Sequence, residues 1–70
     1  MTYRKHMSGD YVAHNGAKFW RISFGLDAAV VKAAPFQKGN ETLFTADHSN
    51  QCTKEEFERA YTKALKMIEL

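Results

Sequence analysis

The clearest hydrophobic pattern lies in residues 11–24, where apolar and polar positions alternate on both sides of Asn15-Gly16. An Asn-Gly pair supplies the two positive φ values of a type I′ turn, so this pattern predicts a two-residue β-hairpin. The turn also predicts the register of the two strands. The expected pairs are His14 with Ala17, Ala13 with Lys18, Val12 with Phe19, Tyr11 with Trp20, and Asp10 with Arg21.

Alternation divides the side chains of this hairpin between two faces. The apolar face is expected to lie in the core and carries Tyr11, Trp20, Ile22 and Phe24. The other face carries Asp10, Val12, His14, Phe19, Arg21 and Ser23. On this second face we expect the ring of Phe19 to be exposed, and the alternative is that a neighbouring strand, the N-terminal arm or a second copy covers it.

The C-terminal part of the chain has the pattern of an amphipathic helix over about residues 54–69. Thr53 and Glu56 form a capping box at its start. Its apolar residues recur at helical spacing and are Phe57, Ala60, Tyr61, Ala64, Leu65 and Ile68. We expect Phe57, Tyr61, Leu65 and Ile68 to pack against Trp20, Ile22 and Phe24 of the sheet.

The remaining segments have weaker patterns. Residues 1–9 show no period and end in Ser8-Gly9, which is typical of an N-terminal arm or a frayed first strand. Residues 28–34 are expected to form a third strand, and the alternative is a short helix that begins after Asp27 and ends before Pro35. A turn at residues 39–40, a short strand at residues 42–45 and a polar loop at residues 46–52 follow.

These elements predict an α+β fold in which an antiparallel meander of three or four strands packs against one C-terminal helix. The chain has 70 residues, of which 44% are hydrophobic, so residues 10–70 are expected to form a single domain. No apolar stretch approaches the length of a membrane-spanning helix, and no secretory signal is recognisable, so we expect a cytoplasmic protein. The single cysteine excludes an internal disulfide, which makes a homodimer one way to gain stability.

Cys52 and the nearby His48 are the residues best suited to bind a metal ion or to take part in catalysis. A zinc site needs about four ligands at close spacings, and the chain offers a single His-x-x-x-Cys pair. A catalytic cysteine needs an orienting third group and an oxyanion loop, and neither is recognisable. The glycines are spread along the chain as turn residues, so no phosphate-binding loop is present. We therefore expect a protein without enzymatic activity, metal or cofactor.

Charge is distributed unequally along the chain. Residues 1–38 carry a net charge of +4 and residues 39–70 carry −2, within a total of +2. A basic sheet with Phe19, Arg21 and Lys18 on it would be able to contact phosphates and stack a base. The alternative is an ordinary solvated face in which Arg21 forms an ion pair with Asp10.

Lys18-Phe19-Trp20-Arg21 and the helix start at residues 53–60 resemble the small arm-binding domains of phage-type integrases, in which a three-stranded sheet enters DNA. That resemblance implies DNA binding, although the basic run that those domains carry in their later strands is missing here. In size and style the chain is also similar to phage-encoded inhibitors such as anti-CRISPR proteins, which bind host machinery without catalysis. This second resemblance implies no roles for individual residues.

The expected function is that of a small protein-binding module or inhibitor that acts by covering the surface of a partner, such as a complex that handles nucleic acid. The alternative is a nucleic-acid-binding domain that uses the basic sheet face. In either case the expected contact residues are Phe19 and Arg21, flanked by His14, Asn15 and Lys18 at the hairpin turn.

Overall fold

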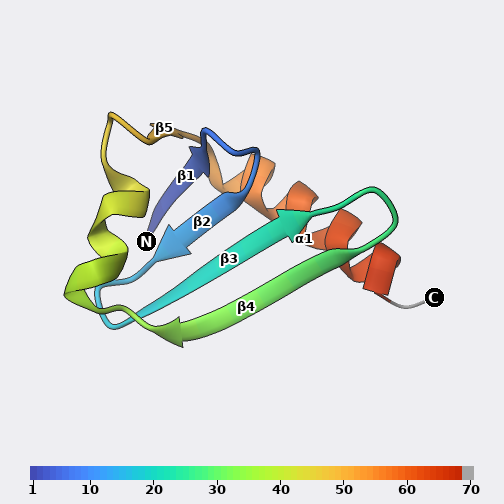
Figure 1. The fold of residues 1–70 in the computed structure, drawn as a ribbon, viewed down its shortest axis with the longest axis horizontal. Helices are drawn as coiled ribbons and strands as arrows, with labels where there is room; N and C mark the ends of the chain where they lie inside the picture. The colour runs from blue at the N-terminus through green and yellow to red at the C-terminus, as the bar shows by residue number, and fades with distance from the viewer. Residues whose placement is uncertain (69–70) are drawn as a thin grey trace.

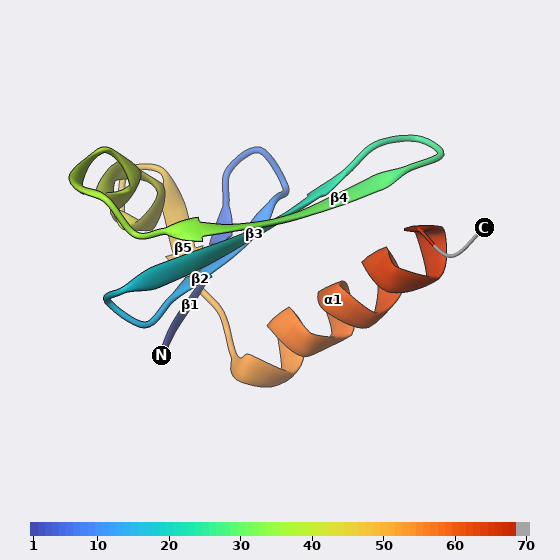
Figure 2. The same ribbon diagram turned by 90° about the horizontal axis from the view of Figure 1, so that it is seen from below.

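A five-stranded antiparallel sheet forms the middle layer of the protein in the computed structural model, which describes residues 1–68 (Figure 1). The elements in chain order are β1 (Thr2–His6), β2 (Tyr11–His14), β3 (Lys18–Phe24), β4 (Ala29–Pro35), the 3₁₀ helix η1 (Lys38–Phe44), β5 (Ser49–Gln51) and α1 (Lys54–Ile68). The strand order is β4-β3-β2-β1-β5. The helix α1 lies across one face, and η1 lies over the opposite face at one end (Figure 2). The predicted α+β class is confirmed, with five strands instead of three or four.

The β2–β3 hairpin forms where the sequence predicts it, but its register differs. Tyr11 pairs with Ile22 instead of Trp20, so the strands are shifted by two residues. The side-chain oxygen of Asn15 accepts hydrogen bonds from the backbone N–H groups of Ala17 (3.0 Å) and Lys18 (2.8 Å). This moves the turn by one residue, and Gly16 is its position of positive φ, at 93°. A shift of two residues keeps every side chain on its expected face.

The N-terminal segment contains a strand of the sheet, so of the two alternatives for residues 1–9, an arm and a first strand, the structure has the strand. Strand β1 pairs with β2 on one side and with β5 on the other. Across the β1–β5 pair, the guanidinium of Arg4 donates from Nε to the hydroxyl of Ser49 and from Nη2 to its carbonyl oxygen, each at 2.6 Å. The sequence could not decide between the two alternatives because residues 1–9 show no alternation of apolar and polar positions.

Residues 28–52 divide into one confirmed and two incorrect predictions. The third strand is confirmed as β4, which pairs with the whole length of β3. The short strand expected at residues 42–45 is wrong, because residues 42–44 belong to η1. The loop expected at residues 46–52 contains the three-residue strand β5. Both errors concern short segments, whose conformation depends on the sheet that they contact.

The helix α1 has its predicted start, and the final predicted residue, 69, lies outside the described residues. The Glu56 N–H donates to the Thr53 hydroxyl at 3.1 Å, which satisfies one free donor of the first turn. Small residues govern the contact with the sheet, because Phe57, Ala60 and Ala64 are buried whereas Tyr61, Leu65 and Ile68 are 38%, 39% and 51% exposed. Of the four helix residues that we expected to pack on the sheet, only Phe57 is buried, with 8% of its surface exposed. Within residues 1–68, no helix is long and apolar enough to cross a membrane.

The sheet face away from α1 has a small core of its own. Val12 is fully buried and Phe19 is only 5% exposed, so the expectation of an exposed Phe19 is wrong. The chain beyond β4 turns back over this face, and the imidazole of His14 stacks on Phe36 with ring centroids 4.2 Å apart. The ring of Phe44, from η1, meets the same imidazole edge-on at 4.4 Å. Phe19 is the cross-strand neighbour of His14, so its side chain lies on the same face, beside the residue that this aromatic cluster surrounds.

Candidate binding surface

The residues that the sequence suggested for binding do not form one surface. Phe19 is buried and has no ring available to a partner. Lys18 lies on the opposite face of β3, with its ammonium 5.9 Å from the centre of the Trp20 ring. Asn15 is exposed, but its side-chain oxygen is occupied by the turn. His14 is held between Phe36 and Phe44. A role for His14, Asn15 and Lys18 in binding stays a prediction.

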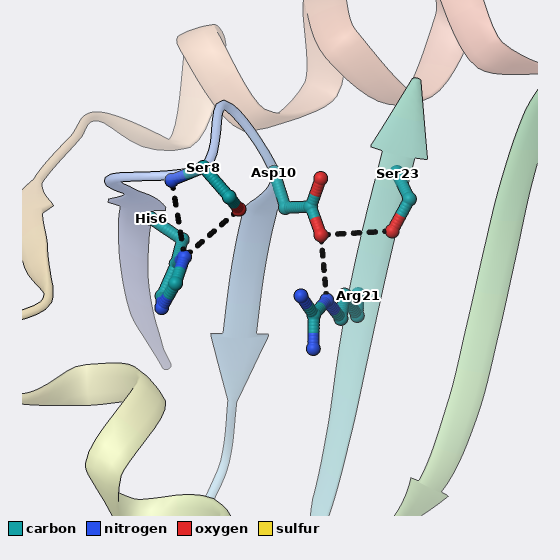
Figure 3. A network of polar contacts seen from close by, with 5 residues as sticks. All are labelled: His6, Ser8, Asp10, Arg21 and Ser23. Carbon is teal, nitrogen blue, oxygen red and sulfur yellow. Dashed lines mark hydrogen bonds and ion pairs between the residues drawn. The ribbon is translucent and has the colours of Figure 1, made fainter. Parts of the chain in front are cut away.

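Arg21 belongs to a polar network on the sheet surface (Figure 3). Its Nε donates to Oδ2 of Asp10 at 2.7 Å, and the hydroxyl of Ser23 donates to the same oxygen at 2.9 Å. The ion pair expected as the alternative to phosphate binding is therefore present. The cross-strand partner of Arg21 on β4 is Lys32, so two like charges stand side by side and the carboxylate of Asp10 contacts only the first of them.

The outer edge of β4 has backbone groups that no other strand uses within residues 1–68. The Phe36 N–H donates to the Ala17 carbonyl, and the Gly25 N–H donates to the Ala28 carbonyl. Residues 28 and 36 are therefore hydrogen-bonded partners of residues 25 and 17, which flank β3. Such pairs alternate along an antiparallel ladder. The N–H and C=O groups of residues 29, 31 and 33 therefore point outwards, away from β3. The sequence could show the strand but not its position at the edge.

One flank of α1 adds apolar side chains beside this edge. Tyr61, Leu65 and Ile68 recur at helical spacing and are all partly exposed. Near Tyr61, an apolar cleft of about 200 Å³ lies between α1 and the sheet. Its walls are formed by Met1, Tyr3, Trp20, Ile22, Val31, Phe57, Glu58 and Tyr61. Val30 on β4 is also 61% exposed, so apolar groups lie on both sides of the open strand edge.

The surroundings of Cys52 disfavour its thiolate form. Burial raises the pKa of the Cys52 thiol, the nearby carboxylate of Glu56 raises it further, and Arg4 and Lys5 oppose these effects. The thiol is therefore a poorer source of the nucleophilic thiolate than an ordinary cysteine. The ring of His48 stacks near that of His6, at 6.4 Å between centroids. In the part of the chain that the structure describes, no three His, Cys, Asp or Glu side chains are grouped for a metal ion.

Comparison with known proteins assigns no family to this arrangement. The chain matches no protein-family profile, no curated protein sequence and no solved structure.

Proposed function

We propose that the protein is a non-enzymatic binding module that takes an extended segment of a partner protein as an additional strand on β4, and that it acts by covering that part of its partner. The observation that supports this most strongly is the open edge of β4. This strand has seven residues, and its outward N–H and C=O groups at Ala29, Val31 and Ala33 are free within the described chain. Main-chain hydrogen bonds of this kind are the usual source of affinity in strand addition.

The edge lacks most of the features that protect edge strands from association. Natural edges are commonly blunted by short length, prolines, bulges or several charges. In β4 a proline is present only at the end, Pro35, and Lys32 is the one charged residue. The opposite edge, β5, is only three residues long. The two edges therefore differ strongly in their capacity to accept a strand.

The surroundings of the edge define the chemistry of the partner. A strand added to β4 directs alternate side chains to the face of α1, next to the apolar flank of Tyr61, Leu65 and Ile68. These side chains would be apolar. The other side chains lie beside Lys32, which stands next to Arg21 and has no carboxylate within 4 Å in the described residues. An acidic side chain there complements Lys32, because the Arg21 guanidinium is already paired with Asp10. We therefore propose an extended partner segment with alternating apolar residues and an acidic residue facing Lys32.

A display library of random peptides tests this proposal, because peptides of many different sequence patterns can then compete for binding to the edge of β4. Selected peptides should alternate in hydrophobicity and carry an acidic residue, and their binding should protect the amides of Ala29, Val31 and Ala33 from hydrogen exchange. Ala33→Pro removes an outward N–H without touching the ladder to β3. It should weaken the best peptide roughly tenfold, which corresponds to about one hydrogen bond and some steric hindrance.

The opposite edge provides the matched control. The backbone of residue 51 points outwards from β5, because Cys52 donates to the Tyr3 carbonyl and bonded pairs alternate. Gln51→Pro should therefore leave peptide affinity unchanged. Equal affinity of Ala33→Pro and the wild type, or protection of amides away from β4, would contradict the proposal. So would protection of the β4 amides in the protein alone together with a dimeric mass, because the occupant would then be a second copy.

A further inference from the structure

The flank of α1 opposite Tyr61 borders a groove with a basic character. Lys5, Tyr11, Phe24, Arg59 and Lys63 line it, together with Gly9, Thr53, Glu56 and Ala60. Its volume is about 690 Å³, which is within the range of sites that hold molecules of nucleotide size. Arg59 and Lys63 also line an adjoining hollow that extends to Lys66. The two hollows share Arg59 and Lys63, and we call them together the basic groove.

The cations of the basic groove are available to a ligand. Within residues 1–68, no carboxylate lies within 4 Å of the charged groups of Lys5, Arg59 or Lys63. The acidic residues at the groove have partners of their own. Glu56 accepts a hydrogen bond from the Thr53 hydroxyl at 3.3 Å. Glu58, at the far end, forms an ion pair with Lys54 at 3.8 Å.

Aromatic rings alternate with these cations. The ammonium of Lys5 lies 5.5 Å from the centre of the Tyr11 ring, and that of Lys63 lies 5.3 Å from the centre of the Phe24 ring. Both rings are partly buried, so each presents an edge or face to the groove. Cations that follow a chain together with rings on which bases stack are the usual components of a site for single-stranded nucleic acid.

We propose that the basic groove binds a single-stranded nucleic acid, whose phosphates contact Lys5, Arg59 and Lys63 and whose bases contact Tyr11 and Phe24. The cations continue beyond the first hollow to Lys66, which suits a chain of phosphates better than a single small anion. This site is separate from the β4 edge, because it lies on the other flank of α1, and it does not depend on the proposed function. It also replaces the basic sheet face, in which Phe19 is buried and Arg21 is neutralised by Asp10.

Fluorescence anisotropy with a labelled oligothymidylate tests this site. Three phosphate contacts predict a slope of about −2 in a plot of log affinity against log salt, or roughly twentyfold weaker binding between about 50 and about 200 mM salt. The double variant Arg59→Gln/Lys63→Gln should reduce the slope to about −0.7 and weaken binding at low salt at least tenfold. Phe24→Leu, which keeps most of the volume but removes the ring, should weaken binding several-fold without changing the slope.

The matched control is a double variant that removes the same two positive charges outside the basic groove. Lys32 lies on the sheet face away from α1, and Lys38 lies in η1 on that side (Figure 2), so Lys32→Gln/Lys38→Gln should retain both the affinity and the slope. Equal losses in the two double variants would overturn the proposal, because binding would then depend only on net charge. Displacement of the oligonucleotide by an equal charge of polyglutamate would overturn it too, since the groove would then serve an acidic peptide. Ala33→Pro should bind the oligonucleotide like the wild type, which separates this result from a failure at β4.

Discussion

Phe19 and Val12 anchor the second, smaller core of the protein, on the sheet face away from α1. An aromatic side chain that is 5% exposed contributes about 2 to 3 kcal/mol by burial alone. The whole stability of a small domain is only about 5 to 15 kcal/mol. One side chain on this face therefore accounts for a large share of the total, and the role of Phe19 is structural.

Phe19→Ala should lower the free energy of unfolding by about 3 to 5 kcal/mol, because it removes buried surface and leaves a cavity beneath His14 and the Phe36 and Phe44 rings. Urea denaturation followed by circular dichroism measures the change. Leu26→Ala is the matched control, because Leu26 is fully exposed and its loss should cost less than about 0.5 kcal/mol. A midpoint for Phe19→Ala equal to that of Leu26→Ala would mean that the aromatic cluster does not cover this face.

At the scale of the element, α1 approaches the sheet through alanines. Ala60 and Ala64 lie over Ile22 and Ala13 in the main core, and their small side chains allow the helix to come close. The apolar stripe of the sequence is wider than the buried strip, so the large residues at its side remain partly exposed. This unused flank gives the β4 edge its apolar surroundings.

Substitutions on α1 should follow this arrangement. Ala64→Leu introduces bulk at a position with no exposure and should destabilise the protein by about 1 to 3 kcal/mol. Leu65→Ala should cost less than the roughly 2 to 5 kcal/mol of a fully buried leucine, below about 2 kcal/mol, because Leu65 is 39% exposed. Thermal unfolding of both variants gives the comparison. If Leu65→Ala were the more damaging, the helix would be rotated relative to the arrangement described here.

Local signals predicted the elements that local chemistry determines. The Thr53 cap, the hairpin around Gly16 and the strand before Pro35 are all present. The pattern could not give the exact hairpin pairs, because the Asn15 side chain competes with the expected turn geometry. It also could not reveal β5, which has three residues and depends on β1 for its pairing.

The proposed binding surfaces were harder to predict than the elements, because each depends on contacts between distant segments. The rings that surround His14, next to Phe19, are those of Phe36 and Phe44, which come after β4 and in the 3₁₀ helix. The basic groove joins Lys5 to Arg59 and Lys63 across most of the chain. The sequence shows these residue types, but only the strand order shows which of them meet.

At the scale of the whole molecule, the two ends of the described chain hold each other in place. Strand β1 lies between β2 and β5 (Figure 1), and it links the meander to the segment that leads into α1. Tyr3 packs on Phe57 of α1 with ring centroids 5.3 Å apart, and its carbonyl accepts the Cys52 N–H at 3.0 Å. The guanidinium of Arg4 fixes Ser49, a buried polar residue.

Removal of residues 1–9 should therefore abolish the cooperative fold, whereas an arm could be removed with little effect. The shortened chain would lose β1, and with it the sheet partner of β5 and the aromatic contact of Phe57. Circular dichroism and the dispersion of amide proton shifts report the loss. A synthetic peptide of residues 1–9, added in excess, should restore both signals, because it binds only the folded state. The same peptide with Tyr3 and Arg4 replaced by alanine is the control and should restore much less. A cooperative thermal transition in the shortened chain alone would contradict this prediction, since β2 to α1 would then form a stable core without β1.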